Sequence, residues 1–296
     1  MLCRSLLSAI QMGTAQLPAS PARPGLAIAM NSSFFGFYAH AAFMAALHDE
    51  GIFPEQVAGS SAGALVSVLC GAGLRGSQLT DFVMQPDLRR SFLDGKALLR
   101  LPGVLSSTFG SGILSGSNAV AFLRSKLHGL RLEDCHPAVQ LGLTNLTHRN
   151  SRLISSGDAA SYAVASCAVP GLFRNQIVDG ERWCDGGVAL PLPFLQWLDD
   201  PTVDLIVLHR IEHVAEHRPE PGWTNLAGGI ADCHQIICDT LHRLRQTISH
   251  DKRIIEIVTT TPHPGLFPSG IRPALLEAGS HAGREASRRI RAESGI

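Results

Sequence analysis

The strongest constraint on this chain is a short stretch in which a glycine-flanked serine joins an apolar run to an apolar helix. Residues 55–59 have the composition of a buried strand, and residues 62–72 are apolar around the whole helical period. The pentapeptide Gly59–Gly63 between them reads Gly-Ser-Ser-Ala-Gly, a match to Gly-x-Ser-x-Gly. This pattern is typical of a serine elbow, which is a sharp strand-to-helix turn with the serine at its apex.

Both glycines of the pentapeptide have a steric purpose in such a turn. Gly59 and Gly63 are expected where the backbone leaves no room for side chains on either side of Ser61. The start of the following helix directs unpaired N–H groups and the positive end of the helix dipole toward the serine. Because the chain has 29 glycines, a match of this length can also arise by chance, and the other segments must supply its context.

Composition excludes several classes of protein. The 296 residues are 45% hydrophobic, which is enough for a large core. Lys and Arg together number 25, as do Asp and Glu, so no basic excess predicts nucleic-acid binding. The seven cysteines lack disulfide-framework spacing, and no apolar run approaches membrane-spanning length. We expect a cytoplasmic protein with at most peripheral membrane contact, although secretion and the oligomeric state stay open.

The chain divides into a leader and one domain. Residues 1–24 combine a short apolar patch with Ala, Pro and Ser, which predicts a flexible leader, because a signal peptide has a longer apolar segment. Residues 25–296 alternate strand-like and helix-like patterns without a linker or an internal repeat. Such alternation predicts a mostly parallel sheet covered by helices on both faces.

The element boundaries follow from apolar periodicity and from cap residues. Strands are expected at 26–30, 55–59, 138–146, 151–154, 203–208 and 254–258, and helices at 38–49, 62–72, 79–84, 117–128, 158–166, 226–248 and 273–291. Ser117 and Asp158 are expected to cap their helices, since a Ser or Asp at that position accepts a hydrogen bond from the first turn. Residues 99–108 are consistent with a lid or with a buried loop.

A second motif follows a predicted β-hairpin far downstream. Residues 175–184 contain Asp179-Gly180, a strong turn signal between two short strand-like runs. The hairpin leads directly into Asp185, which two glycines follow. On its own this aspartate is best interpreted as a turn residue bonded to nearby backbone. With a serine elbow upstream it becomes a candidate base, because a nucleophilic serine and its base must occur as a pair.

Together these motifs resemble those of the patatin-like phospholipases, acyl hydrolases that use a Ser–Asp dyad. The elbow matches the family's Gly-x-Ser-x-Gly, and Asp185-Gly186-Gly187 matches its Asp-Gly-Gly/Ala. Residues 166–171 and the hairpin after them match the segment that precedes this aspartate in the family. The resemblance covers residues 25–291 and implies a three-layer α/β/α fold with a mostly parallel central sheet.

The resemblance also implies a chemistry. Ser61 is the implied nucleophile and Asp185 the implied general base and acid, with an acyl-enzyme intermediate that water hydrolyses. Gly186 and Gly187 let the backbone turn beside the carboxylate without crowding. The implied substrates are phospholipids or related acyl esters, and neither a cofactor nor a metal is expected.

One loop departs from the family's pattern. Members usually carry Gly-Gly-Gly-x-Arg/Lys-Gly after the first strand, whereas residues 31–36 read Asn-Ser-Ser-Phe-Phe-Gly. An oxyanion hole needs backbone donors, which serine also supplies unless the loop requires a positive φ. Phe34 and Phe35 are expected either to line an acyl pocket or to pack in the core. The predicted oxyanion residues are Asn31, Ser32, Ser33 and Gly36.

Three other interpretations remain open. An α/β-hydrolase would use the elbow serine, an acid and a later histidine such as His209, His234 or His242. A non-catalytic lipid-binding protein would keep the fold while losing the oxyanion loop. A zinc site is the third, because His234, Cys238 and His242 recur at helical spacing, as do His209 and His213, although these positions lie in or beside an apolar stripe.

Overall fold

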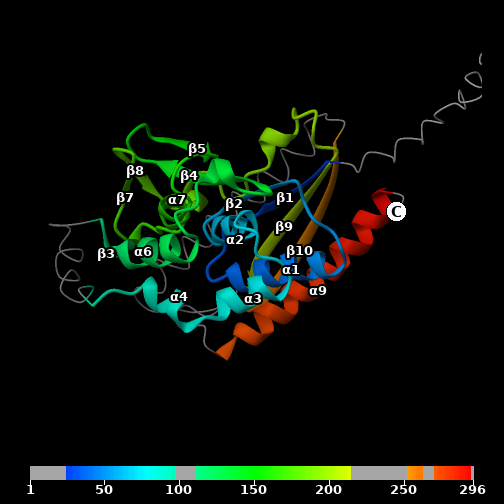
Figure 1. Cartoon of the computed structure of the whole chain (residues 1–296), viewed down its shortest axis with the longest axis horizontal. Helices are drawn as coiled ribbons and strands as arrows, with labels where there is room; N and C mark the ends of the chain where they lie inside the picture. Colours follow the sequence, from blue (N-terminus) through cyan, green and yellow to red (C-terminus); the bar gives the residue numbers. More distant parts are fainter. Residues whose placement is uncertain (1–24, 96, 98–110, 215–251, 263–269, 295–296) are drawn as a thin grey trace, which may run out of the picture.

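A central sheet of eight strands organises the molecule (Figure 1). The structure is a computed structural model that describes residues 25–95, 97, 111–214, 252–262 and 270–294. Neighbouring strands follow the order β10 (Arg253–Pro262), β9 (Leu205–Val214), β1 (Leu26–Met30), β2 (Gln56–Ser60), β4 (Ala138–Asn145), β8 (Glu181–Cys184) and β7 (Gln176–Val178), with β5 (Asn150–Ile154) paired to β4. Strands β10 to β4 are parallel to one another, whereas β5, β7 and β8 join antiparallel, so the predicted mostly parallel sheet is confirmed.

Strand β1 shows why this sheet lies between two layers. It is buried along its whole length, and its side chains alternate between two apolar clusters. Leu26, Ile28 and Met30 face the main core. Ala27 and Ala29 face the opposite cluster, where residues 192–203 supply Phe194 and Trp197. The large side chains of β1 therefore pack into the main core, whereas its alanines pack against the opposite cluster.

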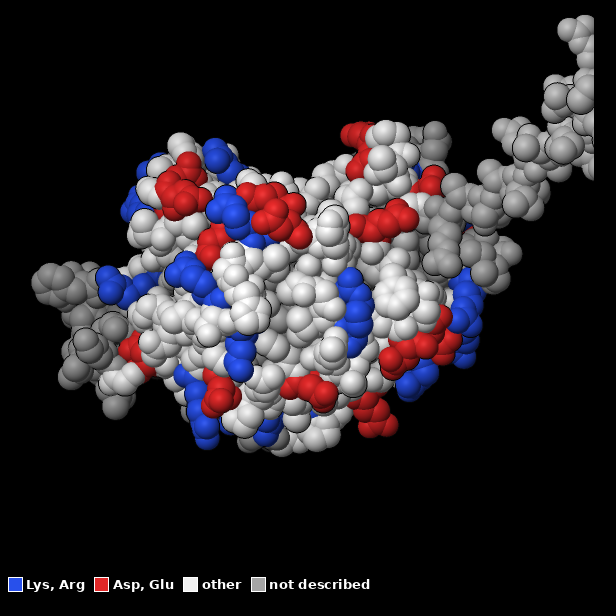
Figure 2. Space-filling view, in the orientation of Figure 1, with Lys and Arg blue, Asp and Glu red and all other residues white. Residues whose placement is uncertain are grey.

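Helices pack against the main core. They are α1 (Phe37–Asp49), α2 (Ala62–Gly71), α3 (Ser77–Met84), α4 (Pro86–Ser91), α6 (Ser117–Lys126), α7 (Ala159–Ser166) and α9 (Arg272–Ser294). Figure 1 shows α9, in red and orange, running alongside α1. On the face displayed in Figure 2, acidic and basic side chains alternate with wide neutral areas, in keeping with the balanced composition.

The strand register brings the site together. Met30 of β1 lies opposite Gly59 of β2 on one side and His209 of β9 on the other. The carboxyl ends of these three parallel strands therefore meet at one edge of the sheet. Loops that leave this edge are the usual place for a ligand site in an α/β fold.

Most predicted elements within the described residues are confirmed, whereas two short strands and the six-residue helix α4 were missed. Strands β3 (Gly112–Leu114) and β6 (Gly171–Phe173) form a separate two-stranded sheet. With three residues each, they are too short to give an alternation signal. Strands β9 and β10 are longer than predicted. Their apolar patterns end at Leu208 and Val258, whereas their pairing continues as far as Val214 and Pro262.

The two predicted helix caps had different outcomes. Asp158 is confirmed as the cap of α7, because its side chain accepts a 2.8 Å hydrogen bond from the Ser161 amide. Ser117 is not a cap: Gly116, at φ +77°, precedes α6, and Ser117 lies inside the first turn. A glycine takes this left-handed conformation without steric cost, which displaces the cap by one residue.

Three expectations concern segments outside the described residues: the leader at 1–24, the segment 99–108 and the helix at 226–248. Within the described ranges, every helix is too short or too polar to cross a membrane.

Candidate active site

Ser61 occupies the turn between β2 and α2 in a conformation that side chains rarely adopt. Its φ is +52° and its ψ is −115°. A Cβ atom on Gly59 would lie 2.2 Å from the carbonyl carbon of Gly63, and one on Gly63 would lie 2.3 Å from the carbonyl oxygen of Met30. Both glycines of the motif are thus required by backbone packing, as the sequence predicted.

The hydroxyl of Ser61 meets the carboxylate of Asp185, although the two residues are 124 positions apart. Ser61 Oγ donates to Asp185 Oδ2 at 2.7 Å. The other carboxylate oxygen, Oδ1, accepts a 2.7 Å bond from the Gly187 amide. The Asp185 backbone is also fixed, since its N–H donates to Ala168 and its carbonyl accepts from Thr144 Oγ1. One carboxylate oxygen is therefore held in place while the other faces Ser61.

Burial makes this carboxyl group unusually basic. Asp185 is only 1% exposed. Burial raises the pKa of Asp185 from 3.8 to about 7, against the opposing effect of the hydrogen bonds from Ser61 and Gly187. A group with a pKa near neutrality can both accept and return a proton.

No histidine of the described residues hydrogen-bonds to this pair. His209 is buried and bonds to His40 and Thr259 instead. The other two histidines proposed for a triad, His234 and His242, lie outside the described residues. Among the residues that the structure describes, Ser61 and Asp185 thus form a two-residue arrangement.

Two further residues hold the elbow, and neither was predicted to do so. Ser166 Oγ accepts the Ser61 amide at 2.9 Å and donates to the Gly142 carbonyl at 2.7 Å. Cys167 Sγ donates to the Ser61 carbonyl at 3.2 Å. Burial raises the pKa of the Cys167 thiol, which keeps it protonated and a poor nucleophile. Their position in the family-like segment 166–171 was the only signal available.

Of the four predicted oxyanion donors in the loop after β1, three have backbone amides that already bond to carbonyls of the protein. The Asn31 amide donates to His209 O, the Ser32 amide to Pro191 O and the Gly36 amide to Ser33 O. These three predicted oxyanion donors are therefore occupied by carbonyls of the protein. Across the described part of the chain, the Ser33 amide has no such acceptor, and Ser33 lines the cavity in front of Ser61.

A second donor adjoins the nucleophile. Ala62 is the first residue of α2, so its N–H is one of the four that the helix itself leaves unpaired. It lines the same cavity as Ser61 and Ser33. Its position directly after the serine is where an elbow usually supplies an oxyanion donor.

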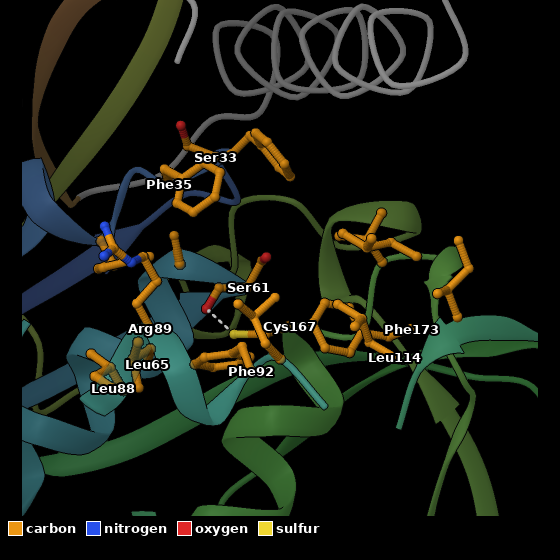
Figure 3. Close-up of a pocket in the computed structure, with 17 residues that line it drawn as sticks. Ser33, Phe35, Ser61, Leu65, Leu88, Arg89, Phe92, Leu114, Cys167 and Phe173 are labelled. Atoms are coloured by element: carbon orange, nitrogen blue, oxygen red, sulfur yellow. Dashed lines mark hydrogen bonds between the residues drawn. The ribbon is translucent and has the colours of Figure 1, made fainter. Parts of the chain in front are cut away.

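The cavity is large and mainly apolar. Its volume is about 640 Å³, and its wall includes Phe34 and Phe35 beside Ser33. In Figure 3, Ser61 lies between Leu65, Leu88 and Arg89 on one side and Leu114 and Phe173 on the other. Arg89 is the one charged side chain among the described residues that line it. Phe35 also packs against the main core, so the expected core packing is confirmed, while the acyl pocket stays a prediction.

Metal-ligand residues do not gather in the described ranges. No group of three His, Cys, Asp or Glu side chains there has the arrangement to hold an ion. His209 and His213 bond to threonine hydroxyls of β10. The spaced residues His234, Cys238 and His242 lie outside the described residues.

The chain belongs to the patatin-like phospholipase family, whose sequence pattern it matches over residues 29–198. This span contains the elbow, Asp185 and the loop after β1. Uncharacterized NTE family proteins of Mycobacterium bovis and Mycobacterium tuberculosis are 29% identical to it over 170 residues, which is 57% of this chain and 44% of theirs. The match therefore spans less than half the length of these relatives.

Two solved structures align with most of this chain. VipD from Legionella pneumophila gives a TM-score of 0.52 at 15% identity, over 92% of this chain and 68% of VipD. The type III effector protein ExoU of Pseudomonas aeruginosa gives a TM-score of 0.43 at 12% identity, over 92% of this chain and 54% of ExoU. At such identities the likeness to VipD concerns the fold alone.

Proposed function

We propose that this chain is a serine lipid acyl hydrolase that cleaves carboxylic ester bonds of phospholipids or related acyl esters through a Ser61–Asp185 dyad. One observation carries the proposal: Ser61, which lines an apolar cavity, donates a 2.7 Å hydrogen bond from its Oγ to the buried carboxylate of Asp185. Membership in the patatin-like phospholipase family supports the lipid substrate.

The reaction proceeds in two halves. Asp185 accepts the Ser61 proton as Oγ attacks the ester carbonyl carbon. The Ser33 and Ala62 amides stabilise the oxyanion, and its collapse expels the alcohol, which takes the proton from Asp185. Water then attacks the acyl-enzyme with Asp185 as base. The second collapse releases the fatty acid and restores the Ser61 hydroxyl.

The cavity indicates how the substrate is held. Its apolar wall suits a single acyl chain, and each buried methylene contributes about 0.8 kcal/mol. Arg89 is the charged lining residue that can meet a phosphate or carboxylate of the substrate. Leu93 lines the same cavity yet is 57% exposed, which supports peripheral contact with a lipid surface at the mouth.

A non-catalytic lipid-binding protein is the second candidate. It is favoured by the loop after β1, where three predicted donors are occupied by protein carbonyls. The two candidates share the apolar cavity and differ only in whether bound ester is cleaved.

The experiment that tests the proposal is hydrolysis of phospholipids and p-nitrophenyl acyl esters by the wild type, Ser61→Ala and Asp185→Asn. The proposal requires turnover by the wild type and its loss in both variants. Lipid binding without turnover by the wild type would support the binding protein. Turnover that survives Asp185→Asn but is lost on replacing a histidine would support a Ser-Asp-His triad.

A further inference from the structure

A buried chain of hydrogen bonds connects the far edge of the sheet to the loop after β1. Thr259 Oγ1 on β10 lies 2.9 Å from His209 Nε2 on β9, and His209 Nδ1 lies 2.9 Å from His40 Nδ1 on α1. His40 Nε2 then lies 3.0 Å from the carbonyl oxygen of Asn31. Both histidines are fully buried, and neither touches Ser61 or Asp185. Burying these polar groups costs desolvation free energy, which indicates that the hydrogen-bonded chain has a structural or functional role.

The proton positions along this chain follow from its last member. A carbonyl oxygen can only accept, so His40 carries its proton on Nε2. Nδ1 of neutral His40 must then accept from His209 Nδ1, and His209 Nε2 accepts the Thr259 hydroxyl. Both rings are neutral, because burial lowers the pKa of His40 to about 3 and that of His209 well below its usual value. Every donor in this chain of hydrogen bonds, here called the relay, therefore points the same way, from Thr259 through His209 and His40 to Asn31.

The relay ends on a peptide group that is held from both sides. The Asn31 carbonyl accepts from His40, while the N–H of the same peptide, on Ser32, donates to Pro191 O at 2.7 Å. The Asn31 side chain adds a double bridge to Ile211, with Nδ2 donating to its carbonyl and Oδ1 accepting its amide. β1 ends at Met30, and beyond it the side-chain carboxamide of Asn31 makes the two hydrogen bonds to the Ile211 backbone that a further strand residue would make to β9.

The next residue along the chain is Ser33, which lines the cavity. A second anchor holds this residue, since Ser33 Oγ lies 3.0 Å from His213 Nε2 and His213 Nδ1 lies 2.9 Å from Thr261 Oγ1. The Ser33 N–H is therefore placed between two fixed points, the Asn31–Ser32 peptide and its own side chain.

We propose that His40, supported by His209 and Thr259, is a positioning residue that aims the Ser33 amide at the oxyanion. The inference rests on the proposed function, since it concerns the same ester cleavage. Side-chain anchors in this chain do what glycine-rich backbone geometry does in the loop pattern that it resembles. Orientation of one oxyanion donor changes kcat by about 100-fold or more, because the charge develops only in the transition state.

His40→Met and His40→Gln test this role. The Met variant keeps the volume but removes the donor to Asn31 O, and the Gln variant keeps an N–H near the position of Nε2. We expect His40→Met to lower kcat about 100-fold with KM nearly unchanged, and His40→Gln to recover at least about tenfold of that loss. Rates are expressed per site titrated with a fluorophosphonate, so unfolded protein does not count.

His48→Met is the matched control. His48 is a second buried histidine of α1, and its Nδ1 accepts the Gly76 amide at 3.3 Å, away from the loop. This variant should lose stability while keeping kcat per titrated site. If His40→Met does not fold, Thr259→Val applies, with kcat about three- to tenfold lower, the value of one buried hydrogen bond.

NMR tests the relay without turnover. Long-range ¹⁵N–¹H spectra should show neutral rings at pH 6, with the proton of His40 on Nε2 and that of His209 on Nδ1. The opposite tautomers, or unchanged kcat per titrated site in a folded His40→Met or Thr259→Val protein, would overturn the inference while leaving the proposed function intact. Absence of wild-type turnover would instead refute the proposed function and, with it, this inference.

Discussion

Replacement of Asp185 by Asn separates catalysis from stability more sharply than any other single change. The side chains have the same shape, and Asn still accepts the Gly187 amide with its oxygen while its NH₂ group faces Ser61 Oγ. The variant lacks only the ability to take a proton. Turnover should fall at least about 1,000-fold, because the base contributes up to about four orders of magnitude and no second base adjoins Ser61 in the described residues.

In contrast to turnover, the free energy of unfolding should be higher in Asp185→Asn than in the wild type at pH 8. The pKa of Asp185 is about 7 when folded against an ordinary 3.8, so ionising it in the folded state costs about 4 kcal/mol at pH 8. As the pH rises, the unfolded chain loses this proton first. The contribution of Asp185 to the free energy of unfolding is therefore largest below pH 4, falls between pH 4 and 7 and is constant above. Asn removes the penalty but buries an amide, so we expect a gain of about 2 to 4 kcal/mol at pH 8 and none at pH 4.

The assay is urea unfolding of both proteins at pH 4, 6 and 8, together with ester hydrolysis at pH 8. Asp158→Asn is the control, since Asp158 caps α7 and pairs with Arg124 on the surface. That control should change stability by no more than about 1 kcal/mol and leave turnover intact. A destabilised Asp185→Asn protein at pH 8, or one with wild-type turnover, would refute the reasoning.

Three further predictions concern the wild-type site. The logarithm of kcat/KM should rise with slope one below pH 6 and level off above pH 8, since attack needs ionised Asp185 and its pKa is about 7; a flat profile would contradict this. Arg89→Gln should lower kcat/KM for anionic phospholipids about tenfold and leave neutral p-nitrophenyl esters unaffected, whereas an equal loss for both would exclude a head-group contact. With p-nitrophenyl esters of increasing length, kcat/KM should rise about fourfold per added methylene until the cavity is filled, and no dependence on length would exclude an acyl pocket.

Local patterns were sufficient to predict that Ser61 and Asp185 belong to one site, and to predict most of the sheet. Gly63 is required by the Met30 carbonyl of the neighbouring strand β1, so its reason is not local, although the pentapeptide pattern predicts it. Gly59 is required by Gly63 four residues later, and the hairpin before Asp185 has a two-residue turn signal with positive φ at Asp179 and Gly180. Such features depend on neighbours in the sequence. They can therefore be recognised before the fold is known.

Other features depend on distant contacts and could not be predicted. Occupation of the Ser32 amide requires Pro191, and the role of Asn31 requires Ile211 on β9. His40 lies in an apolar helical stripe, where nothing in the sequence shows that its partner is His209. For the same reason the sequence predicted four equivalent oxyanion donors, and it could not show that the amides of Asn31, Ser32 and Gly36 bond to carbonyls of the protein.

The central claim is that Ser61 is a nucleophile activated by Asp185 alone. Intact-protein mass spectrometry after exposure to a fluorophosphonate at pH 8, followed by peptide mapping, tests it most directly. We predict one phosphonyl group per wild-type chain, located on Ser61, no labelling of Ser61→Ala, and labelling of Asp185→Asn that is at least about 100-fold slower. An unlabelled wild type, a label on another residue, or equal labelling rates for the wild type and Asp185→Asn would contradict the claim.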